Sequence, residues 1–466
     1  MPPEKRINMQ IDTKENIIME NLIKGYMDFL DNNKTERRCA ATVVETAIAN
    51  GYRNIDDVKT LKAGDKVYYS RMGKTAILFN IGSDCICKGM NILGAHIDSP
   101  RLDVKQSPIY EDTGLVYLNT HYYGGIKKYQ WVAIPLAIDG FIFLTDGTKV
   151  DVRIGDDPQD PVFTISDILP HIAQDQMKKT AAEFIEGEKL DLILGCYPAQ
   201  NKTDKDKADD SEPSGKDKIL AILKDKYGIE EEDFASAELE VVPAGKTRYL
   251  GFDKTLVLGY GQDDRVCAYT SLIAMLESTA GTRTNCCILV DKEEIGSQGA
   301  TGMDSMLLEN AVAEVVFRLG LDNPELSIRR ALANSYMLSS DVNAAYDPLN
   351  SSLYDKQNSS FLGKGVVFNK YTGSRGKSAA SDANAEYLAL VRGQLKSHDV
   401  TFQMAEMSKV DVGGGGTIAK YAAKYGMQVI DCGVSVLSMH APWEITSTYD
   451  IEQAYLGYKA FLAIKR

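Results

Sequence analysis

The sequence predicts an α/β fold with a second, β-rich domain inserted into it, and three observations support this prediction. Apolar strand-like runs alternate with amphipathic helical segments near both ends of the chain. Between residues 104 and 241, short strand-like runs follow one another and are separated by turn residues. The chain of 466 residues is also longer than one ordinary core accommodates. We therefore expect one mixed-sheet domain built from residues 1–103 and 242–466, interrupted by an inserted domain of residues 104–241.

The N-terminal part of the first domain begins with two expected helices and continues with strands. Apolar side chains recur every three to four residues in 14–31, which is typical of an amphipathic helix. A second helix is expected from Thr35, a candidate N-cap, to Ala49, because Gly51 follows as a stop signal. Residues 67–70 and 75–80 read as two strands joined by a tight turn.

In the inserted domain and the C-terminal part, strands and helices are again predicted from apolar runs and turn residues. Strands are expected in the insert at 115–118, 131–135, 141–144 and 150–154. After residue 242, we expect strands at 287–290, 335–340, 400–404 and 428–435. The expected helices there are 266–277, one near 307–310, 381–392, 418–425 and 451–464. This alternation of strands and helices is what predicts the α/β class for the first domain.

Composition excludes several classes of partner. The net charge of −13 argues against nucleic acid and anionic membrane as partners. No apolar run approaches the roughly 18 residues that span a bilayer, and the first residues do not read as a signal peptide. The eight cysteines show no C-x-x-C spacing, so free thiols in a reducing compartment are expected. A cytoplasmic location follows as an expectation.

The residues from Val290 to Gly302 are the most informative stretch of the sequence. A buried strand is expected to end at Val290, and the adjacent carboxylates Glu293 and Glu294 follow before a glycine-rich loop. Carboxylates that repel one another in a desolvated site usually share a cation or a proton. An isolated Glu-Glu pair is also typical of a solvated loop, so the pair alone leaves both interpretations open.

Similar groups end or follow four other apolar strand-like runs, at 91–96, 256–260, 335–340 and 428–435. They are His96 with Asp98 two residues on, Asp263 with Asp264, Asp341, and His440. Each has an ordinary explanation, such as a satisfied histidine or a helix cap. In an open α/β sheet, however, the carboxyl ends of the strands meet at one edge. Two histidines with several carboxylates suit zinc, or else manganese or cobalt, and two metals held by a bridging carboxylate would act together in hydrolysis.

Five motifs, in this order, resemble those of the aspartyl aminopeptidase family. They are G-A-H-I-D-S-P-R-L-D from Gly94, G-Q-D-D-R from Gly261, D-K-E-E-I-G-S from Asp291, S-D-V-N from Ser340 and S-M-H from Ser438. The resemblance spans nearly the whole chain. It implies a dinuclear-zinc aminopeptidase acting on peptides, with two zinc ions per subunit that cobalt or manganese can replace. It also implies a metallopeptidase domain interrupted by a dimerisation domain, and assembly into dimers and a tetrahedral dodecamer.

The same resemblance assigns metal ligands by motif. His96 and Asp341 would bind one zinc ion, Glu294 and His440 would bind the other, and Asp263 would bridge the two. The family often has Asp-Asn at the bridging motif, where this chain has two aspartates. Asp264 therefore remains the alternative bridge.

The remaining roles are also implied by the resemblance. Asp98 would orient His96, and Glu293 would act as the general base. His171, which follows a proline in the insert, is similar to a family histidine that reaches the active site of a neighbouring subunit. A preference for acidic N-terminal residues is implied as well. Arg375 or Lys377 is the candidate partner of such a side chain, although solvated loop charges are an equal interpretation of both residues.

Three other functions are alternatives to that of an aminopeptidase. An N-acyl amino acid deacylase on the same scaffold would use the same metals but would not require a free amine. A catalytically silent assembly protein is disfavoured because every expected ligand is present. A dinucleotide-binding enzyme is disfavoured because the glycine-rich residues 296–302 follow two carboxylates, which would repel a pyrophosphate.

Overall fold

The computed structural model describes residues 3–197, 213–279 and 281–465, without side chains before residue 17. The chain forms two compact units. The first consists of Met1–Ser99, Thr247–Met439 and Trp443–Arg466, and the second of Pro100–Lys246 and His440–Pro442. Within the described ranges, no helix combines the length and the apolar character that crossing a bilayer requires.

The first unit is built on a nine-stranded mixed sheet, ordered β1-β2-β3-β13-β4-β14-β18-β16-β17. Its strands are β1 (Arg53–Asn54), β2 (Lys66–Arg71), β3 (Thr75–Asn80), β4 (Met90–His96), β13 (Thr284–Val290), β14 (Tyr336–Ser340), β16 (Val366–Asn369), β17 (Phe402–Met404) and β18 (Gln428–Gly433). Strands β13, β4, β14 and β18 are parallel neighbours. Strands β3 and β16 flank them in the antiparallel sense.

The four parallel strands place the chain segments that follow them at one edge of the sheet. Every residue of β4 and β13 is buried, as expected for strands covered on both faces. Val290 lies opposite His96, and Ser340 lies opposite Cys432. Because the carboxyl ends of parallel strands coincide, the groups that follow β4, β13 and β14 are brought together.

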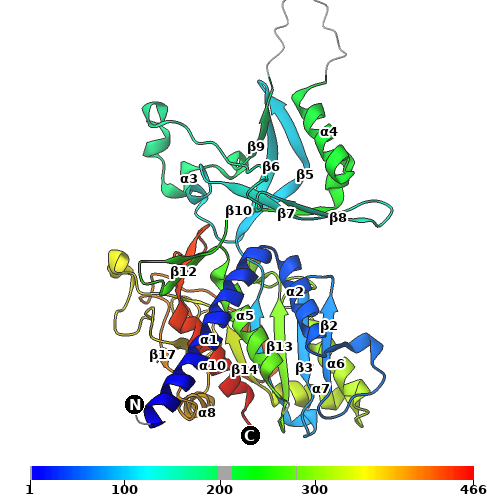
Figure 1. The fold of residues 1–466 in the computed structure, drawn as a ribbon, viewed down its shortest axis with the longest axis vertical. Coiled ribbons are helices and arrows are strands. Elements are labelled where there is room, and N and C mark those ends of the chain that lie inside the picture. Colours follow the sequence, from blue (N-terminus) through cyan, green and yellow to red (C-terminus); the bar gives the residue numbers. More distant parts are fainter. Residues whose placement is uncertain (1–2, 198–212, 280, 466) are drawn as a thin grey trace, which may run out of the picture. The chain divides into compact units, whose positions relative to one another are not determined.

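Helices cover both faces of this sheet. The core on one face draws side chains from α1 (Pro3–Asn32), α2 (Glu36–Ala49), α5 (Gln262–Glu277), α8 (Ala385–Lys396) and α10 (Thr448–Leu462). The core on the other face draws on α6 (Leu307–Arg318), α7 (Pro324–Ala333) and α9 (Ala419–Ala423). Figure 1 shows α1, α5 and α10 lying in front of β13 and β14. The resulting order of helix, sheet and helix layers is the α/β architecture that the sequence predicts.

A smaller five-stranded sheet completes the first unit. Its strands, in spatial order, are β11 (Arg248–Leu250), β12 (Leu256–Gly259), β20 (Glu444–Ser447), β19 (Ser435–Leu437) and β15 (Asn343–Ala344). β12 ends two residues before α5 begins, and β20 runs directly into α10. The small sheet therefore fixes the start of both helices.

The second unit is an antiparallel six-stranded sheet ordered β8-β7-β10-β5-β6-β9. The strands are β5 (Arg101–Asp112), β6 (Leu115–Tyr123), β7 (Leu136–Phe143), β8 (Lys149–Ile154), β9 (Leu192–Cys196) and β10 (Ala237–Pro243). Helix α4 (Gly215–Tyr227) packs on β5, β6 and β9, and α3 (Ala181–Phe184) is a single turn. Helix α4 begins with a capping box in which Ser214 and Asp217 satisfy one another's backbone N–H groups.

Several expected elements differ from those observed. The strand expected at 131–135 is wrong, because those residues form bends and β7 starts only at Leu136. Pro135 has no N–H to donate to a ladder, and Ala133 has a φ of 58°. The helix expected at 418–425 is confined to Ala419–Ala423, and the one near 307–310 extends to Arg318.

A close backbone approach between β18 and the end of β14 leads to the first prediction. A Cβ atom on Gly433 would lie 1.9 Å from the carbonyl oxygen of Asp341. We expect Gly433→Ala to lower the free energy of unfolding by about 1–3 kcal/mol, because the backbone must move. A Cβ atom on Gly393, in α8, would have no neighbouring atom within 4 Å. Gly393→Ala should therefore raise the free energy of unfolding by about 0.5–1 kcal/mol. Denaturant unfolding of both variants tests this contrast. Equal shifts of the unfolding midpoint in Gly433→Ala and Gly393→Ala would contradict the prediction.

Candidate metal centre

The imidazole of His96, at the end of β4, is held by carboxylates on both ring nitrogens. Its Nδ1 lies 3.3 Å from Oδ1 of Asp98 and 3.1 Å from the carbonyl oxygen of the same residue. Its Nε2 lies 3.2 Å from Oδ1 of Asp263 and 3.9 Å from Oδ1 of Asp341. Burial alone lowers the pKa of His96, but hydrogen bonds to Asp263 and Asp98 outweigh it and raise the pKa well above its usual value.

The carboxylate of Asp98 contacts two strand ends at once. Its Oδ1 accepts a hydrogen bond from the backbone N–H of Glu293, and its Oδ2 accepts one from that of Glu294, both at 3.2 Å. These two glutamates open the single 3₁₀ turn η8 (Glu293–Ile295), which follows β13. Asp98 is fully buried and also touches the ring of His96. It therefore positions the backbone of both glutamates relative to the histidine.

Two groups of potential metal ligands meet at His96. One group combines His96 with Asp263 and Glu294, and the other combines it with Glu293 and Asp341. In each group the ligand atoms all lie within 4.8 Å of one another. Imidazole nitrogen and carboxylate oxygen, without a thiolate, form a donor set that zinc accepts, as do manganese and cobalt.

The electrostatics of the site favour a cation. Burial raises the pKa of Asp341 well above its usual value, and the nearby charges of Asp263 and Glu293 raise it further, while His96 opposes the shift. Burial likewise raises the pKa of Asp264. Several carboxylates thus share one imidazole in a desolvated space, where their ionised forms repel one another. A divalent cation would compensate this charge, so the residues fit a bound metal.

The two neighbouring aspartates of α5 have different surroundings. Asp263 faces His96, and its backbone N–H donates to Oε2 of Glu444 at 3.1 Å. Asp264 is completely buried next to Cys267 and belongs to neither group of potential ligands. This geometry favours Asp263 over Asp264 as a ligand.

Two of the histidines that the sequence singles out lie in the second unit. Nδ1 of His440 is 2.9 Å from the carbonyl oxygen of Gly125. His171 is exposed in the short 3₁₀ helix η4 (Pro170–Ile172). Neither residue belongs to the two ligand groups found among the described side chains, so their roles stay predictions.

Two carboxylates near the site were not identified from the sequence. Glu444 of β20 accepts the N–H of Asp263, as noted above. Asp431 of β18 is buried and accepts a hydrogen bond from the hydroxyl of Thr417, and burial raises its pKa to about 7. The charge of Glu293 also raises the pKa of Asp431. An aspartate inside the apolar run V-I-D-C-G was the available signal for Asp431.

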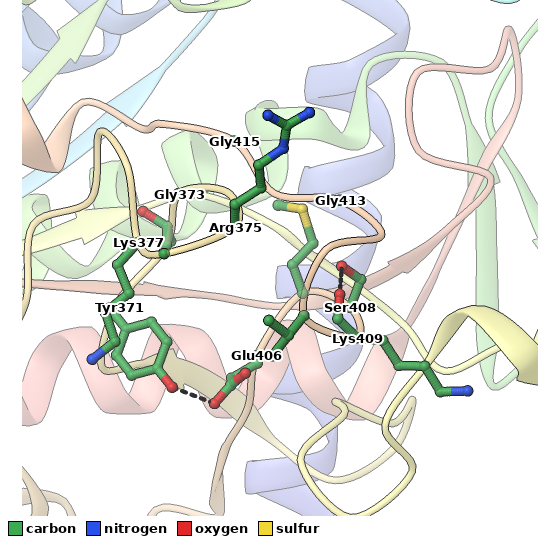
Figure 2. A pocket seen from close by; sticks show the side chains of 13 residues that line it. Tyr371, Gly373, Arg375, Lys377, Glu406, Ser408, Lys409, Gly413 and Gly415 are labelled. Carbon is green, nitrogen blue, oxygen red and sulfur yellow. Dashed lines mark hydrogen bonds between the residues drawn. The ribbon is translucent and has the colours of Figure 1, made fainter.

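A basic cavity of about 280 Å³ lies between the loops 371–377 and 406–415 of the first unit. The N–H of Gly373 donates to the carbonyl of Gly415 at 2.7 Å, which joins the two loops. Figure 2 shows the hydrogen bond between Tyr371 and Glu406 on one side of the cavity. The side chain of Arg375 extends away from this pair of residues.

Among the described residues, Arg375 has neither a hydrogen bond nor an ion pair, whereas the ammonium of Lys377 lies 3.6 Å from Asp382 and over the ring of Tyr371. The guanidinium of Arg375 is therefore available to an anionic ligand of this cavity.

The layered fold and its histidine–carboxylate cluster define a metal-dependent enzyme of the α/β class. The family model of aminopeptidase I zinc metalloproteases (M18) matches residues 29–462. A Clostridium acetobutylicum protein called probable M18 family aminopeptidase 1 is 56% identical over 94% of this chain and 93% of its own length.

Two crystal structures are similar over nearly the whole chain. An M18-family aminopeptidase from Thermotoga maritima has a TM-score of 0.90 at 41% identity, covering 95% of this chain and 96% of its own. Aminopeptidase I from Clostridium acetobutylicum has a TM-score of 0.86 at 53% identity, covering 94% of each chain. The chain belongs to the M18 family and is a zinc metallo-aminopeptidase. The family resemblance and the α/β fold class predicted from the sequence are thus confirmed.

The contacts of Asp98 lead to the second prediction. In Asp98→Asn, one carboxylate oxygen becomes an amide nitrogen that cannot accept the N–H of Glu293 or Glu294. We expect zinc affinity to fall by about 10–100-fold, as is typical when a group that orients metal ligands is lost. Competition with a chelator measures the Kd for zinc. Asp56→Asn, which alters an exposed ion pair with Arg71, is the matched control. Unchanged zinc affinity in Asp98→Asn would show that Asp98 does not position the ligands.

Proposed function

We propose that the enzyme removes N-terminal residues from peptides with two metal ions held at the edge of the central sheet. His96 and Asp341 would hold one ion, Glu294 and His440 would hold the other, and Asp263 would be shared by the two. The observation that carries this proposal is the pair of ligand groups that share His96. His440 enters the proposal by its motif alone.

Bound zinc ions would polarise the scissile carbonyl. They would also lower the pKa of a bound water, so that hydroxide is available near neutral pH. Glu293 takes a proton from the attacking water on its carboxylate and later passes it to the leaving amine. Its proximity to His96 and Asp341 supports this role, and the hydrogen bond from its backbone N–H to Asp98 keeps it there. The free N-terminal amine would be held by one metal or by a nearby carboxylate, which would make the enzyme an exopeptidase.

The third prediction tests this mechanism. Metal-free protein titrated with zinc, cobalt or manganese should regain hydrolysis of aminoacyl p-nitroanilides near two metals per chain, and N-acetylated substrates should not be cleaved. Glu293→Gln should keep both metals and lose about 10²–10⁴-fold in kcat, because the proton acceptor is gone. Glu294→Gln should lose metal instead.

Three outcomes would each contradict one part of the mechanism. Near-normal turnover by metal-loaded Glu293→Gln would remove Glu293 as the base. Full activity at one metal per chain would remove the dinuclear centre. Cleavage of N-acyl amino acids without cleavage of free-amine substrates would favour a deacylase.

We further propose that the basic cavity beside Arg375 favours acidic N-terminal residues. Support comes from the guanidinium of Arg375, which has no ion-pair partner among the described residues, and from Lys377 and Lys409, which also line the cavity. A planar guanidinium binds a carboxylate with two parallel hydrogen bonds, which gives selectivity as well as affinity.

The fourth prediction concerns this selectivity. Arg375→Ala should lower kcat/KM for a glutamyl substrate by about 10-fold or more relative to a leucyl substrate, because a charge-assisted hydrogen bond of roughly 1.5–3 kcal/mol is lost. Arg392→Ala, on the exposed face of α8, is the control and should leave the ratio unchanged. An unchanged ratio in Arg375→Ala would exclude Arg375 as the specificity residue.

We also propose that copies of this chain associate through the second unit, as dimers and in a tetrahedral dodecamer, with His171 reaching the active site of a neighbouring copy. His171 lies in a segment rich in exposed apolar side chains, including Ile172 at 68% and Met177 at 69% exposure. Exposed apolar clusters of this kind mark association surfaces. A structure of S. cerevisiae mApe1, 21% identical with a TM-score of 0.73, is described as a dodecamer. A cytoplasmic location stays a prediction.

The fifth prediction tests this association by sedimentation. Ile172→Asp should shift the chain from a large assembly to small species, since a charge would have to be buried at the interface. Ile48→Asp, at an isoleucine of α2 that is 53% exposed, should leave the assembly intact. A wild-type chain that sediments as a stable monomer would remove the proposal.

A further inference from the structure

A second cavity lies inside the second unit, between its sheet and α4. Its volume is about 220 Å³, and all six strands of the sheet contribute to its wall. Ile109, Leu118, Ile142 and Val152 line it from the sheet, and Leu223 lines it from the helix. The cavity is separate from the residues of the metal centre, which all belong to the first unit apart from His440.

Helix α4 covers the apolar face of this sheet only in part. It packs on β5, β6 and β9, whereas side chains of β7, β8 and β10 also line the cavity. Leu223 of α4 is half-buried, and Ile222 is 54% exposed although it lines the cavity. The helix therefore leaves space above the sheet, and Ile222 lies where that space reaches the surface.

The wall of the cavity is almost entirely hydrocarbon. Lys226 and Tyr227, at the end of α4, are the only lining residues with polar side chains. A buried water needs about two to four polar partners, so water gains little by entering. The atoms that line an empty space have no dispersion contacts on the side that faces it. An apolar cavity of about 150 Å³ is known to stay dry and to bind benzene.

The burial of the sheet side chains distinguishes a small ligand from a protein partner. Ile142 is 0% exposed and Val152 is 2% exposed. A protein surface docking on the outside of the unit cannot reach these atoms without displacing α4. A molecule that enters the existing space can reach them.

We propose that this cavity binds one small uncharged apolar molecule, of about the size of a substituted benzene ring. Lys226 is the one charged lining residue, and it is exposed at the end of α4. An ionised group inside the cavity would therefore lose its hydration without compensation. The site is independent of the peptidase centre, and its test does not depend on catalysis.

Isothermal titration of the full-length protein with toluene tests the proposal, with benzoate as the charged analogue. We expect toluene to bind with a stoichiometry near one per chain and to raise the Tm, and benzoate to have no effect. Val152→Phe places a ring inside the cavity and should weaken toluene binding at least tenfold. Val162→Phe is the matched control, because Val162 is 54% exposed and lies outside the lining; it should bind toluene like the wild type.

A second variant keeps the test decisive if Val152→Phe fails to fold. Leu223→Phe fills the same space from the half-buried side of α4 and should have the same effect on toluene. The proposal is overturned if the wild type shows no saturable binding of toluene. It is also overturned if a folded cavity-filling variant binds toluene as the wild type does, or if benzoate binds equally well.

Discussion

The carboxylate of Asp98 joins the end of β4 to the turn that follows β13, and the geometry of the metal centre depends on this contact. One buried side chain accepts two backbone N–H groups and contacts the ring of His96. The parallel pairing of β4 with β13 brings the two ends together, because His96 lies opposite Val290. Sheet register provides the approximate position, and the three contacts of Asp98 determine how Glu293 and Glu294 face the histidine.

Buried negative charge is the second constraint on the site. The carboxylates around His96 are desolvated, and repulsion among them adds to the cost of ionising each one. Such a cluster lowers the stability of the fold unless a cation neutralises it. The layered core on both faces of the sheet provides the rigidity that keeps these groups together. The same repulsion that disfavours the metal-free site favours binding of divalent metal.

Much of the first unit could be predicted because its signals are local. The apolar runs that form β4 and β13 are continuous, and each ends at a group that the fold brings to the same edge. The position of Asp263 next to His96 follows from the same reasoning. The family motifs added the assignment of individual roles, which periodicity does not supply.

Features that depend on distant partners could not be predicted. Glu444 is a strand residue whose partner, the N–H of Asp263, lies far away in sequence. In the sequence, Asp431 is only a polar residue within an apolar strand, because its partner, the hydroxyl of Thr417, is brought to it by the fold. The false strand at 131–135 is apolar enough to suggest a ladder, but Pro135 and the left-handed Ala133 prevent one. The cavity beneath α4 arises from incomplete coverage of a sheet, which has no signature in the helix sequence.

The most direct test of the proposed dinuclear centre is anomalous diffraction at the zinc edge from crystals of the zinc-loaded enzyme. We expect two peaks per chain, about 3.5–4 Å apart, with the carboxylate of Asp263 between them and His96 bound to one of them. A single peak per chain, or a pair of peaks bridged by Asp264, would contradict the proposed arrangement.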